Sequence, residues 1–503
     1  MRLVGTRADI GAYESAVNDA STLFVTSNAD SGIGSLRQAV ISSNANPGPQ
    51  NIEFNVAGNC PQIVFLQSPL PDITDSVEID GYSQPGSSAN TQSNGSDAEL
   101  CLVLTAASGT LAQVLQVPDA APANTSLVLK GIAFMGANFF NGNMTAALRL
   151  RSGSNHLIQG NAFGGTGPGS IGSLGSPNFG IQIRGTAQNA LIGGPQPEHR
   201  NTFGNMMSSA IVLNDATSGN ITGHTIQNNY IGLSPFANAA TPIGLNGIFA
   251  SASPNVSILD NVIVAVPSNA AIQITGASAI FYRIQGNRIG ITPYSIATAP
   301  FQVGTGILLT GGTGKHDIGD FNTFGQSNTI TNSDGAGIWL TSTAGSGTII
   351  RPNRIYGNGI GGVGLGIDLG DLGPLSNDSG DTDGGPNGGQ NWPEVVSSVP
   401  GPNGTQLVGL VLDSTASTQY LIDVYRSPDC AGGNRGGNTT THISSFNVTT
   451  SNLGFWTSNI SMSAAGAAGY LTATATSMAT GDTSEVGACY HETSDVIFAN
   501  GFN

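Results

Sequence analysis

The chain has 503 residues, 9% of them charged and 39% hydrophobic, and its formal net charge is −16. A typical soluble protein has about 25% charged residues, so we expect a surface made mainly of Ser, Thr, Asn, Gln and Gly. Disorder is excluded outside the loops, because hydrophobic residues are frequent and periodic. Lys130 and Lys315 are the two lysines, and without a basic stripe nucleic-acid binding is excluded. No apolar run reaches the ~20 residues of a membrane-spanning helix, so no transmembrane segment is predicted.

Residues 1–21 are interpreted as a remnant or linker segment. Residues 9–14 are strand-like, and a polar linker follows them. Met1 is not followed by the basic, apolar and small-residue order of a secretion signal, so a signal peptide is not present in this chain. We expect that export information was lost with a missing amino-terminal part, or that this start codon is internal.

A short helix is predicted to begin near Ser35, after a strand at residues 24–26 and a Gly-rich turn. Ser35 is a suitable N-cap, because its hydroxyl can accept a hydrogen bond from the first turn. One face of this helix is apolar and comprises Leu36, Ala39 and Val40. Strands at residues 52–56 and 63–66 follow, so we expect the helix to cover the open end of the next structure. Arg37 is interpreted as a salt-bridge or carbonyl partner.

The middle of the chain repeats a phrase: a small residue, an aliphatic residue, any residue, and another apolar residue. The phrase begins at Ala147, Gly180, Ala210, Gly247, Ala271, Gly306, Gly337 and Gly366, at intervals of 24 to 37 residues. Between these phrases lies Asn-x-Ile or Asn-x-Phe, beginning at Asn161, Asn201, Asn229, Asn261, Asn287, Asn328 and Asn353. Short strand signals and a turn residue at this period are typical of a strand solenoid.

The spacing within each phrase predicts which side chains face inward. Apolar-x-apolar has a period of two, so the flanking side chains point inward and the middle one points outward. We expect the recurring Asn at a corner, because Asn tolerates the left-handed backbone region and its amide can bond the Asn one coil away.

The pattern changes after residue 372. Residues 373–396 form a linker loop rich in Asp, Gly and Asn, and longer alternating strands follow within residues 397–492. These predicted strands lie at residues 405–412, 419–426, 441–450, 454–461 and 469–476. Several strands at this spacing are typical of a small β-sandwich of immunoglobulin type. Residues 493–503 form a separate C-terminal tail.

The four cysteines are well separated and lack the Cys-x-x-Cys spacing of zinc or redox sites. Cys60 and Cys101 both fall in the amino-terminal strand region, whereas Cys430 and Cys489 both fall in the carboxy-terminal region. We predict local pairing, Cys60 with Cys101 and Cys430 with Cys489, which implies an oxidising compartment. Free buried thiols are the alternative.

Several segments resemble a known family. Residues 34–39, Gly-Ser-Leu-Arg-Gln-Ala, resemble the CSLREA-type motif of bacterial secreted right-handed parallel β-helix proteins with a pectin-lyase-like fold, although the leading Cys is absent and Gln replaces Glu. Further segments similar to this group are residues 79–86, 366–370 and 381–387. The resemblance implies an all-β chain with a right-handed parallel β-helix over residues 22–372 and an extracellular or cell-surface location. It transfers no catalytic residues, since most members have no assigned activity.

One outward stripe of the solenoid suggests a ligand site. Its residues are Arg149, Gln182, Val212, Phe249, Gln273, Leu308, Trp339 and Asp368. Trp339 lies one coil from Asp368, and Asp371 follows closely. An aromatic ring beside carboxylates can stack on a sugar ring, so we predict that Trp339, Asp368 and Asp371 bind a ligand. The alternative is that a loop or the following domain covers Trp339.

The arrangement of acidic residues does not favour hydrolysis. A glycosidase needs two carboxyl groups about 5–9.5 Å apart. Between residues 120 and 316 the carboxylates are Glu198, Asp215 and Asp260, and none pairs with another by this register. The leading hypothesis is non-catalytic adhesion or glycan binding, with a neutral polysaccharide or another surface protein as the partner. The alternative is a polysaccharide lyase or glycoside hydrolase with its site near Trp339 and Asp368.

The linker loop also predicts a calcium site. Asp378, Asp381 and Asp383 lie within six positions, in residues 377–391 that contain no lysine or arginine. Ca²⁺ takes six to eight oxygen ligands, and alternating Asp with turn-forming Gly can supply them from a loop. The alternative is a solvated acidic linker stabilised by Asx-turns.

Overall fold

The computed structural model describes residues 2–4, 7–9, 21–106, 113–135, 146–164, 178–214, 221–320, 326–360, 364–430, 437–463 and 469–492. Asp215 and the predicted tail, residues 493–503, lie outside them. The chain divides into two compact units, which are taken separately here: Met1–Ile272 with Ile291–Phe301, and Gln273–Gly290 with Gln302–Asn503. At the amino terminus, β1 (Arg2–Val4) and β2 (Arg7–Asp9) pair antiparallel.

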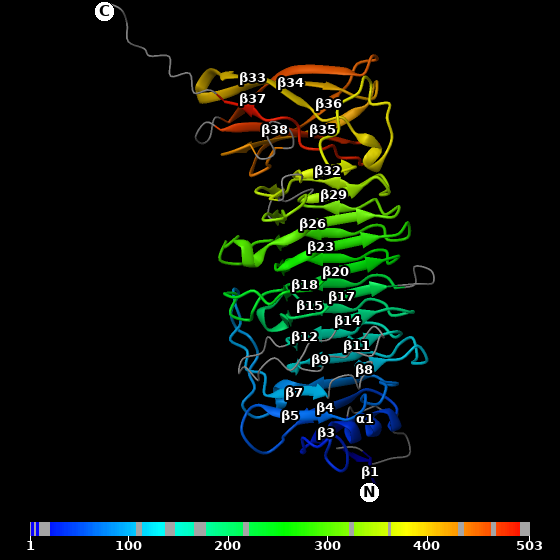
Figure 1. The fold of residues 1–503 in the computed structure, drawn as a ribbon. Coiled ribbons are helices and arrows are strands. Elements are labelled where there is room, and N and C mark those ends of the chain that lie inside the picture. The colour runs from blue at the N-terminus through cyan, green and yellow to red at the C-terminus, as the bar shows by residue number, and fades with distance from the viewer. Residues whose placement is uncertain are drawn as a thin grey trace, which may run out of the picture. The chain divides into compact units, whose positions relative to one another are not determined.

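In the first unit, successive coils of the chain add parallel strands to three sheets (Figure 1). The first sheet runs β3 (Thr22–Val25), β4 (Gln50–Phe54), β6 (Val77–Asp80), β9 (Leu127–Lys130), β12 (Leu157–Gln159), β15 (Leu191–Gly193), β18 (Thr225–Gln227) and β21 (Ser257–Leu259). The second runs β5 (Gln62–Leu66), β7 (Leu102–Ala106), β10 (Ile132–Phe134), β13 (Ala162–Phe163), β16 (Thr202–Phe203), β19 (Tyr230–Ile231) and β22 (Val262–Ile263). The third runs β8 (Gln113–Val117), β11 (Ala146–Leu150), β14 (Phe179–Ile183), β17 (Ser209–Asn214) and β20 (Asn246–Ser251). This architecture is the predicted right-handed parallel β-helix.

The inward positions of the repeated phrase build the core of the coils. Leu148 pairs with Ile181, Ile181 with Ile211, and Ile211 with Ile248, and all four are fully buried. Burying one such side chain stabilises the fold by about 1.5–3 kcal/mol, so a column of them holds consecutive coils in register. The predicted period-two pattern is confirmed.

The predicted Asn ladder is present, but its backbone differs from the expectation. The Nδ2 of Asn201 donates to the Oδ1 of Asn229 at 2.9 Å, and the Nδ2 of Asn229 donates to the Oδ1 of Asn261 at 3.0 Å. Each of these side chains is buried. The left-handed residue at this corner is the one before the ladder Asn, for example Asn228 (φ 57°) and Asp260 (φ 55°). The expectation that the ladder Asn is itself left-handed was wrong, because it is selected for its amide.

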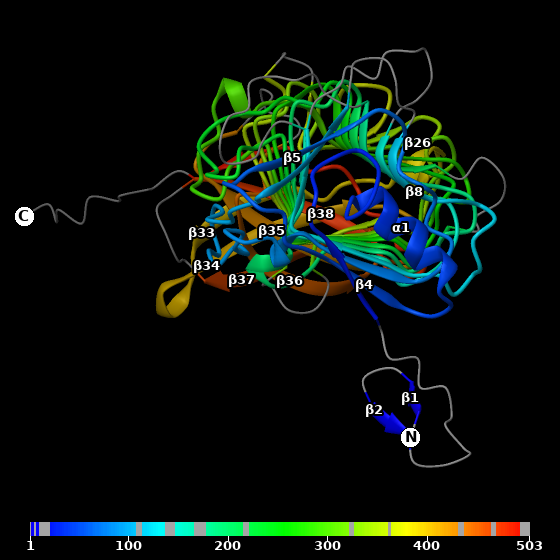
Figure 2. The ribbon, with the colours of Figure 1, turned by 90° about the horizontal axis from the view of Figure 1, so that it is seen from below.

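A helix covers the first strands of this unit, as predicted. Helix α1 (Leu36–Ala45) begins after Ser35, whose hydroxyl accepts a hydrogen bond from the Gln38 N–H. Its buried face includes Leu36 and Val40, and it contacts β3 and β4 (Figure 2). Arg37 pairs with Asp30 at 2.6 Å and donates to three backbone carbonyls, which confirms its structural role. Within the described residues, no helix has the length and apolar character needed to cross a bilayer.

Five 3₁₀ turns accompany the strands and the helix among the described residues. They are η1 (Gly81–Ser83), η2 (Pro197–His199) and η3 (Ala299–Phe301) in the first unit, and η4 (Pro386–Gly389) in the second, which also holds the short turn η5 (Pro402–Gly404). The described part of β23 (Val266–Thr275) contains residues of both units.

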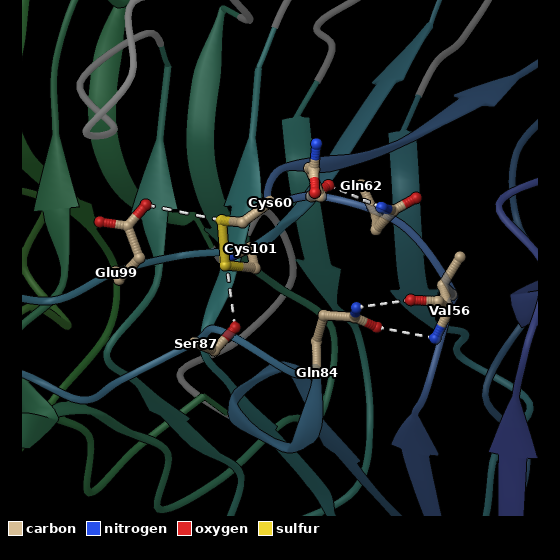
Figure 3. Close-up of a disulfide and its surroundings, with 8 residues drawn as sticks. Val56, Cys60, Gln62, Gln84, Ser87, Glu99 and Cys101 are labelled. Atoms are coloured by element: carbon tan, nitrogen blue, oxygen red, sulfur yellow. Dashed lines mark hydrogen bonds between the residues drawn. A yellow bond between two sulfur atoms is a disulfide. The ribbon is translucent and has the colours of Figure 1, made fainter.

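The predicted disulfides are confirmed. Figure 3 shows Cys60 bonded to Cys101, with the Gln84 side chain nearby accepting from and donating to the backbone of Val56. The second disulfide joins Cys430 to Cys489. The first closes a separation of 41 residues and the second one of 59. Both bonds therefore restrict the unfolded chain within their own unit.

In the second unit, three short parallel stacks precede two antiparallel sheets. The stacks are β24 (Arg283–Gln285), β27 (Asp317–Ile318) and β30 (Ile349–Ile350); β25 (Arg288–Ile289), β28 (Thr329–Ile330) and β31 (Arg354–Ile355); and β26 (Val303–Thr310), β29 (Ile338–Thr341) and β32 (Ile367–Gly370). One antiparallel sheet contains β33 (Glu394–Pro400), β34 (Thr405–Asp413) and β37 (Phe455–Ser463). The other contains β36 (Thr441–Thr449), β35 (Gln419–Ser427), β38 (Tyr470–Ser477) and β39 (Tyr490–His491). Buried residues of both sheets, such as Leu410 and Ile422, share one core, so the sheets form a sandwich.

The sandwich also supplies hydrogen-bond acceptors to the last strand of each parallel stack. The Ile350 N–H donates to the Thr483 hydroxyl at 3.0 Å, and the Ile355 N–H donates to the Thr439 hydroxyl at 3.1 Å. The Leu369 N–H donates to the Oε1 of Glu485 at 3.0 Å. The side chains of the sandwich therefore accept hydrogen bonds from backbone N–H groups that would otherwise be unpaired at the open edge of each parallel stack.

Candidate functional site

The residues predicted to bind a ligand lie at the positions that the strand register predicted, but one of them is buried. Trp339 on β29 is paired with Asp368 on β32. The indole Nε1 of Trp339 donates to the Gly370 carbonyl at 3.0 Å and the ring is half-buried, whereas Asp371 is exposed. Asp368 is 0% exposed. A glycan therefore cannot touch the Asp368 carboxyl group in this structure, and a ligand role of Trp339 and Asp371 stays a prediction.

Asp368 is covered together with a second buried acid, Glu485. The two Glu485 oxygens accept hydrogen bonds from the Leu369 and Leu375 N–H groups, at 3.0 and 2.9 Å. Burial raises the pKa of Asp368 to about 7, and it raises the pKa of Glu485 to about 8, with the charge of Asp368 adding to the latter. The Oδ1 of Asp368 has no hydrogen-bond partner among the described residues. At neutral pH Glu485 is therefore mainly protonated and Asp368 is partly protonated, which fits a role of the two groups in closing the last coil.

The linker acids meet, as the calcium prediction requires. Carboxylate oxygens of Asp378, Asp381 and Asp383 lie within 4.8 Å of one another. Two protein donors already use Asp381, because its oxygens accept from the Asn391 N–H at 2.9 Å and from the Ser414 hydroxyl at 2.6 Å. Burial raises the pKa of both Asp381 and Asp383, and the charge of Asp378 adds to each. Calcium binding here stays a prediction.

A Ser, a His and an Asp also meet in the second unit, at Ser445, His442 and Asp423. The Nε2 of His442 lies 2.8 Å from the Ser445 hydroxyl and 3.2 Å from the Oδ1 of Asp423. A catalytic relay needs the acid on one ring nitrogen and the serine on the other. Here both use the same nitrogen, and Arg351 forms a two-pronged ion pair with Asp423. Although burial alone would raise the pKa of Asp423, Arg351 and His442 lower it. The cluster is a buried ion-pair network.

The first unit places Glu198 and Asp80, two acids from distant parts of the sequence, in one pocket. The pocket has a volume of about 270 Å³, and Tyr82 and Lys130 also line it. Asp80 ends β6, so it lies outside the range of residues 120–316 in which no pair of carboxylates was predicted. Lys130 neutralises Asp80 at 3.3 Å, and its Nζ lies 2.6 Å from a neighbouring glutamate. The Tyr82 hydroxyl is committed to the Gly160 carbonyl at 2.9 Å.

A larger cleft, of about 900 Å³, opens in the second unit. Its walls are the outward side of β24, β27 and β30 and the turn at residues 477–482. The Phe281 ring is 53% exposed and Met478 is 46% exposed, so the cleft presents apolar surface to solvent. Its charged side chains are Arg283, Lys315, Asp317 and Asp482. The sequence analysis did not predict this cleft, because the turn at residues 477–482 has no periodic relation to the strands that form the other wall.

The backbone at Phe281 and Lys315 is unusual. A left-handed residue stands two positions before β12, β15, β18 and β21 of the first sheet, and likewise before β24, β27 and β30. These residues are Asn155 (φ 57°), Asn189 (φ 53°), Gly223 (φ 75°), Asn255 (φ 56°), Phe281 (φ 60°), Lys315 (φ 59°) and Gly347 (φ 84°). Asn and Gly adopt this conformation readily, whereas a bulky side chain there is strained. Strained positions cluster at ligand sites, where the conformation directs a side chain. Phe281 and Lys315 both face the cleft.

The other charged groups of the cleft have partners. Arg283 donates to the side-chain oxygens of Gln285 and Gln326, at 2.5 and 3.0 Å. Asp317 is paired in register with Arg283, so the two charges offset each other. Asp482 accepts from the Gly347 N–H at 2.6 Å. These contacts leave the Phe281 ring and the Lys315 ammonium as the groups available to a ligand.

Comparisons with known proteins give remote likenesses. No family model and no curated protein sequence matches the chain. A solved structure of ORF18 from Geobacillus virus E2 covers 94% of this chain and 77% of its own, at 11% identity and a TM-score of 0.36. The Dettilon tailspike protein gp208 covers 88% and 93%, at 11% identity and a TM-score of 0.34. A periplasmic alginate epimerase covers 66% and 82%, at 10% identity and a TM-score of 0.20. Likeness at this level carries no argument about what this chain binds.

Proposed function

We propose that this protein is a secreted or cell-surface β-helix that binds a polysaccharide without cleaving it, through the cleft at Phe281 and Lys315. The observation that carries the proposal is the exposed Phe281 ring in an open cleft of about 900 Å³. An aromatic face stacks on the apolar face of a sugar, and nearby polar groups orient the hydroxyls. The two disulfides support an oxidising location outside the cell. Membership of the CSLREA-type group and the immunoglobulin type of the sandwich belong to the same proposal.

The rigid setting of the cleft supports binding rather than a transient contact. The strands beneath Phe281 are held by paired, buried neighbours such as Ile284 and Ile318. When a binding side chain is already held by a rigid strand, little conformational entropy of the protein is lost on ligand binding. The left-handed backbone of Phe281 further fixes where its ring points.

An enzyme near Trp339 and Asp368 is the less favoured alternative. Such an enzyme needs a carboxyl group that reaches the glycosidic bond. The burial of Asp368 and its enclosure with Glu485 argue against that contact.

A polysaccharide binding panel combined with a product assay tests the proposal. We expect wild-type protein to bind a polysaccharide, and Phe281→Asn to lose about fivefold in affinity, since an aromatic contact contributes about 1 kcal/mol. The Asn side chain suits the left-handed backbone, so the fold is retained. Phe236→Asn is the matched control, because Phe236 is 58% exposed but lies outside the cleft. Release of reducing ends or unsaturated products would instead establish catalysis, and equal binding by both variants would exclude the cleft.

A further inference from the structure

Lys315 is an isolated cation in an acidic protein. The chain has two lysines and a net charge of −16. Lys130 is held by ion pairs with Glu78 and Asp80. The Lys315 ammonium, in contrast, forms no ion pair with any residue in the described part of the chain. It is exposed and lines the cleft beside Phe281.

The backbone conformation makes an incidental lysine at this position costly. At equivalent positions of the preceding coils, Asn155, Asn189 and Asn255 occupy the left-handed region, where their side chains are tolerated. A lysine there carries strain that no described contact of its side chain offsets. The strain is instead consistent with a side chain that is directed at a ligand.

We infer that the cleft selects a polysaccharide bearing sparse carboxylate groups, and that Lys315 binds the carboxylate while Phe281 stacks on the sugar that carries it. This inference rests on the proposed function and specifies its substrate class. In the cleft, Arg283 lies opposite Asp317 in register and Asp482 accepts from the Gly347 N–H, whereas the Lys315 ammonium has no carboxylate partner within ion-pair distance among the described residues. A ligand carboxylate can supply that partner through a charge-assisted hydrogen bond.

The net charge of the protein limits how closely the carboxylates can be spaced along the bound polysaccharide. A polyuronate, with a negative charge on every sugar, is repelled by a protein of charge −16. Charges separated by more than about 8 Å are largely screened at physiological ionic strength. A chain in which neutral sugars separate the carboxylates therefore gains the contact with Lys315 and avoids most of the repulsion.

The test compares two forms of one polysaccharide. The probe is a heteropolysaccharide with one glucuronate per tetrasaccharide repeat, used native and after chemical reduction of its carboxyl groups. We expect wild-type protein to bind the native form about tenfold more tightly, the effect of one favourable charge contact. Lys315→Asn should lose this preference, and it should melt at a higher temperature because the strain is gone. Lys315→Arg should keep the preference.

The outcomes separate this inference from the proposed function. Equal binding of both forms by wild-type protein overturns the carboxylate inference and leaves glycan binding intact. Binding of neither form, alongside no binding across the polysaccharide panel, overturns the proposed function. A preference that survives in Lys315→Asn assigns the carboxylate to another residue and also contradicts the inference. Phe281→Asn should weaken the binding of both polysaccharide forms by the same factor, because the Phe281 ring stacks on the sugar whether or not the sugar has a carboxylate.

Discussion

Replacing Asp368 by Asn should change how the stability of the second unit depends on pH. In the folded protein burial raises the pKa of Asp368 from 3.8 to about 7. Between these values the folded state holds a proton that the unfolded state has released. Stability from this group is therefore greatest below the unfolded pKa and is lost as the pH rises through the folded pKa.

The size of the effect follows from the proton difference. One proton contributes about 1.4 kcal/mol of free energy of unfolding per pH unit. Between about pH 5 and about pH 8, wild-type protein should lose roughly 2–3 kcal/mol through Asp368, and Asp368→Asn should not. Asn retains an oxygen that can accept from the Gly373 N–H, as the carboxylate does at 3.3 Å. The pKa of the neighbouring Glu485 is raised to about 8, so both proteins also lose free energy of unfolding through Glu485 as the pH rises.

Denaturant unfolding followed by tryptophan fluorescence measures this difference. The three tryptophans, Trp339, Trp392 and Trp456, all belong to the second unit, so the signal reports on that unit. Asp371→Asn is the control, because it removes an exposed carboxylate three positions away. A wild-type-to-variant difference that is the same at about pH 5 and about pH 8 would refute the reasoning, since it would mean that Asp368 keeps its ordinary pKa when folded.

Three further predictions test other parts of the structure. Phe281→Asn should raise the free energy of unfolding by about 1 kcal/mol, through relief of left-handed strain; a destabilised variant in thermal melts would contradict this. Arg351→Met removes the guanidinium from the buried Asp423, which keeps only the polar contacts of His442 and Ser445. Denaturant unfolding should therefore reveal a loss of about 3–5 kcal/mol in the free energy of unfolding, and a loss below about 1 kcal/mol would show that the pair is not buried in solution. Millimolar Ca²⁺ should raise the melting temperature relative to chelator, and the double variant Asp381→Ala with Asp383→Ala should abolish that rise; no rise in wild-type protein would leave a solvated acidic linker.

The local regularities of the fold were predictable from the sequence. The inward columns, such as Leu148 with Ile181, and the Asn ladder follow from a period that each coil repeats. The predicted alternating strands correspond to β34 through β38. Strands β33 and β39 were not predicted, because β33 is largely exposed and β39 has two residues. The equivalence of Phe281 and Lys315 to Asn155 and Asn189 was not predicted, because it depends on a left-handed backbone position that the structure shows.

The sequence by itself determined the parallel coils, the capping helix and the disulfide pairs, because each depends on periodicity or on neighbouring segments. Only the tertiary structure decided which polar groups are exposed to solvent and which are buried. Glu485 lies 116 residues from Leu369, and no repeat relates them, yet their hydrogen bond encloses Asp368. The cleft arises in the same way, where a turn of the sandwich meets strands of the coils. Exposure depends on such contacts between remote segments, and a local sequence pattern contains no information about them.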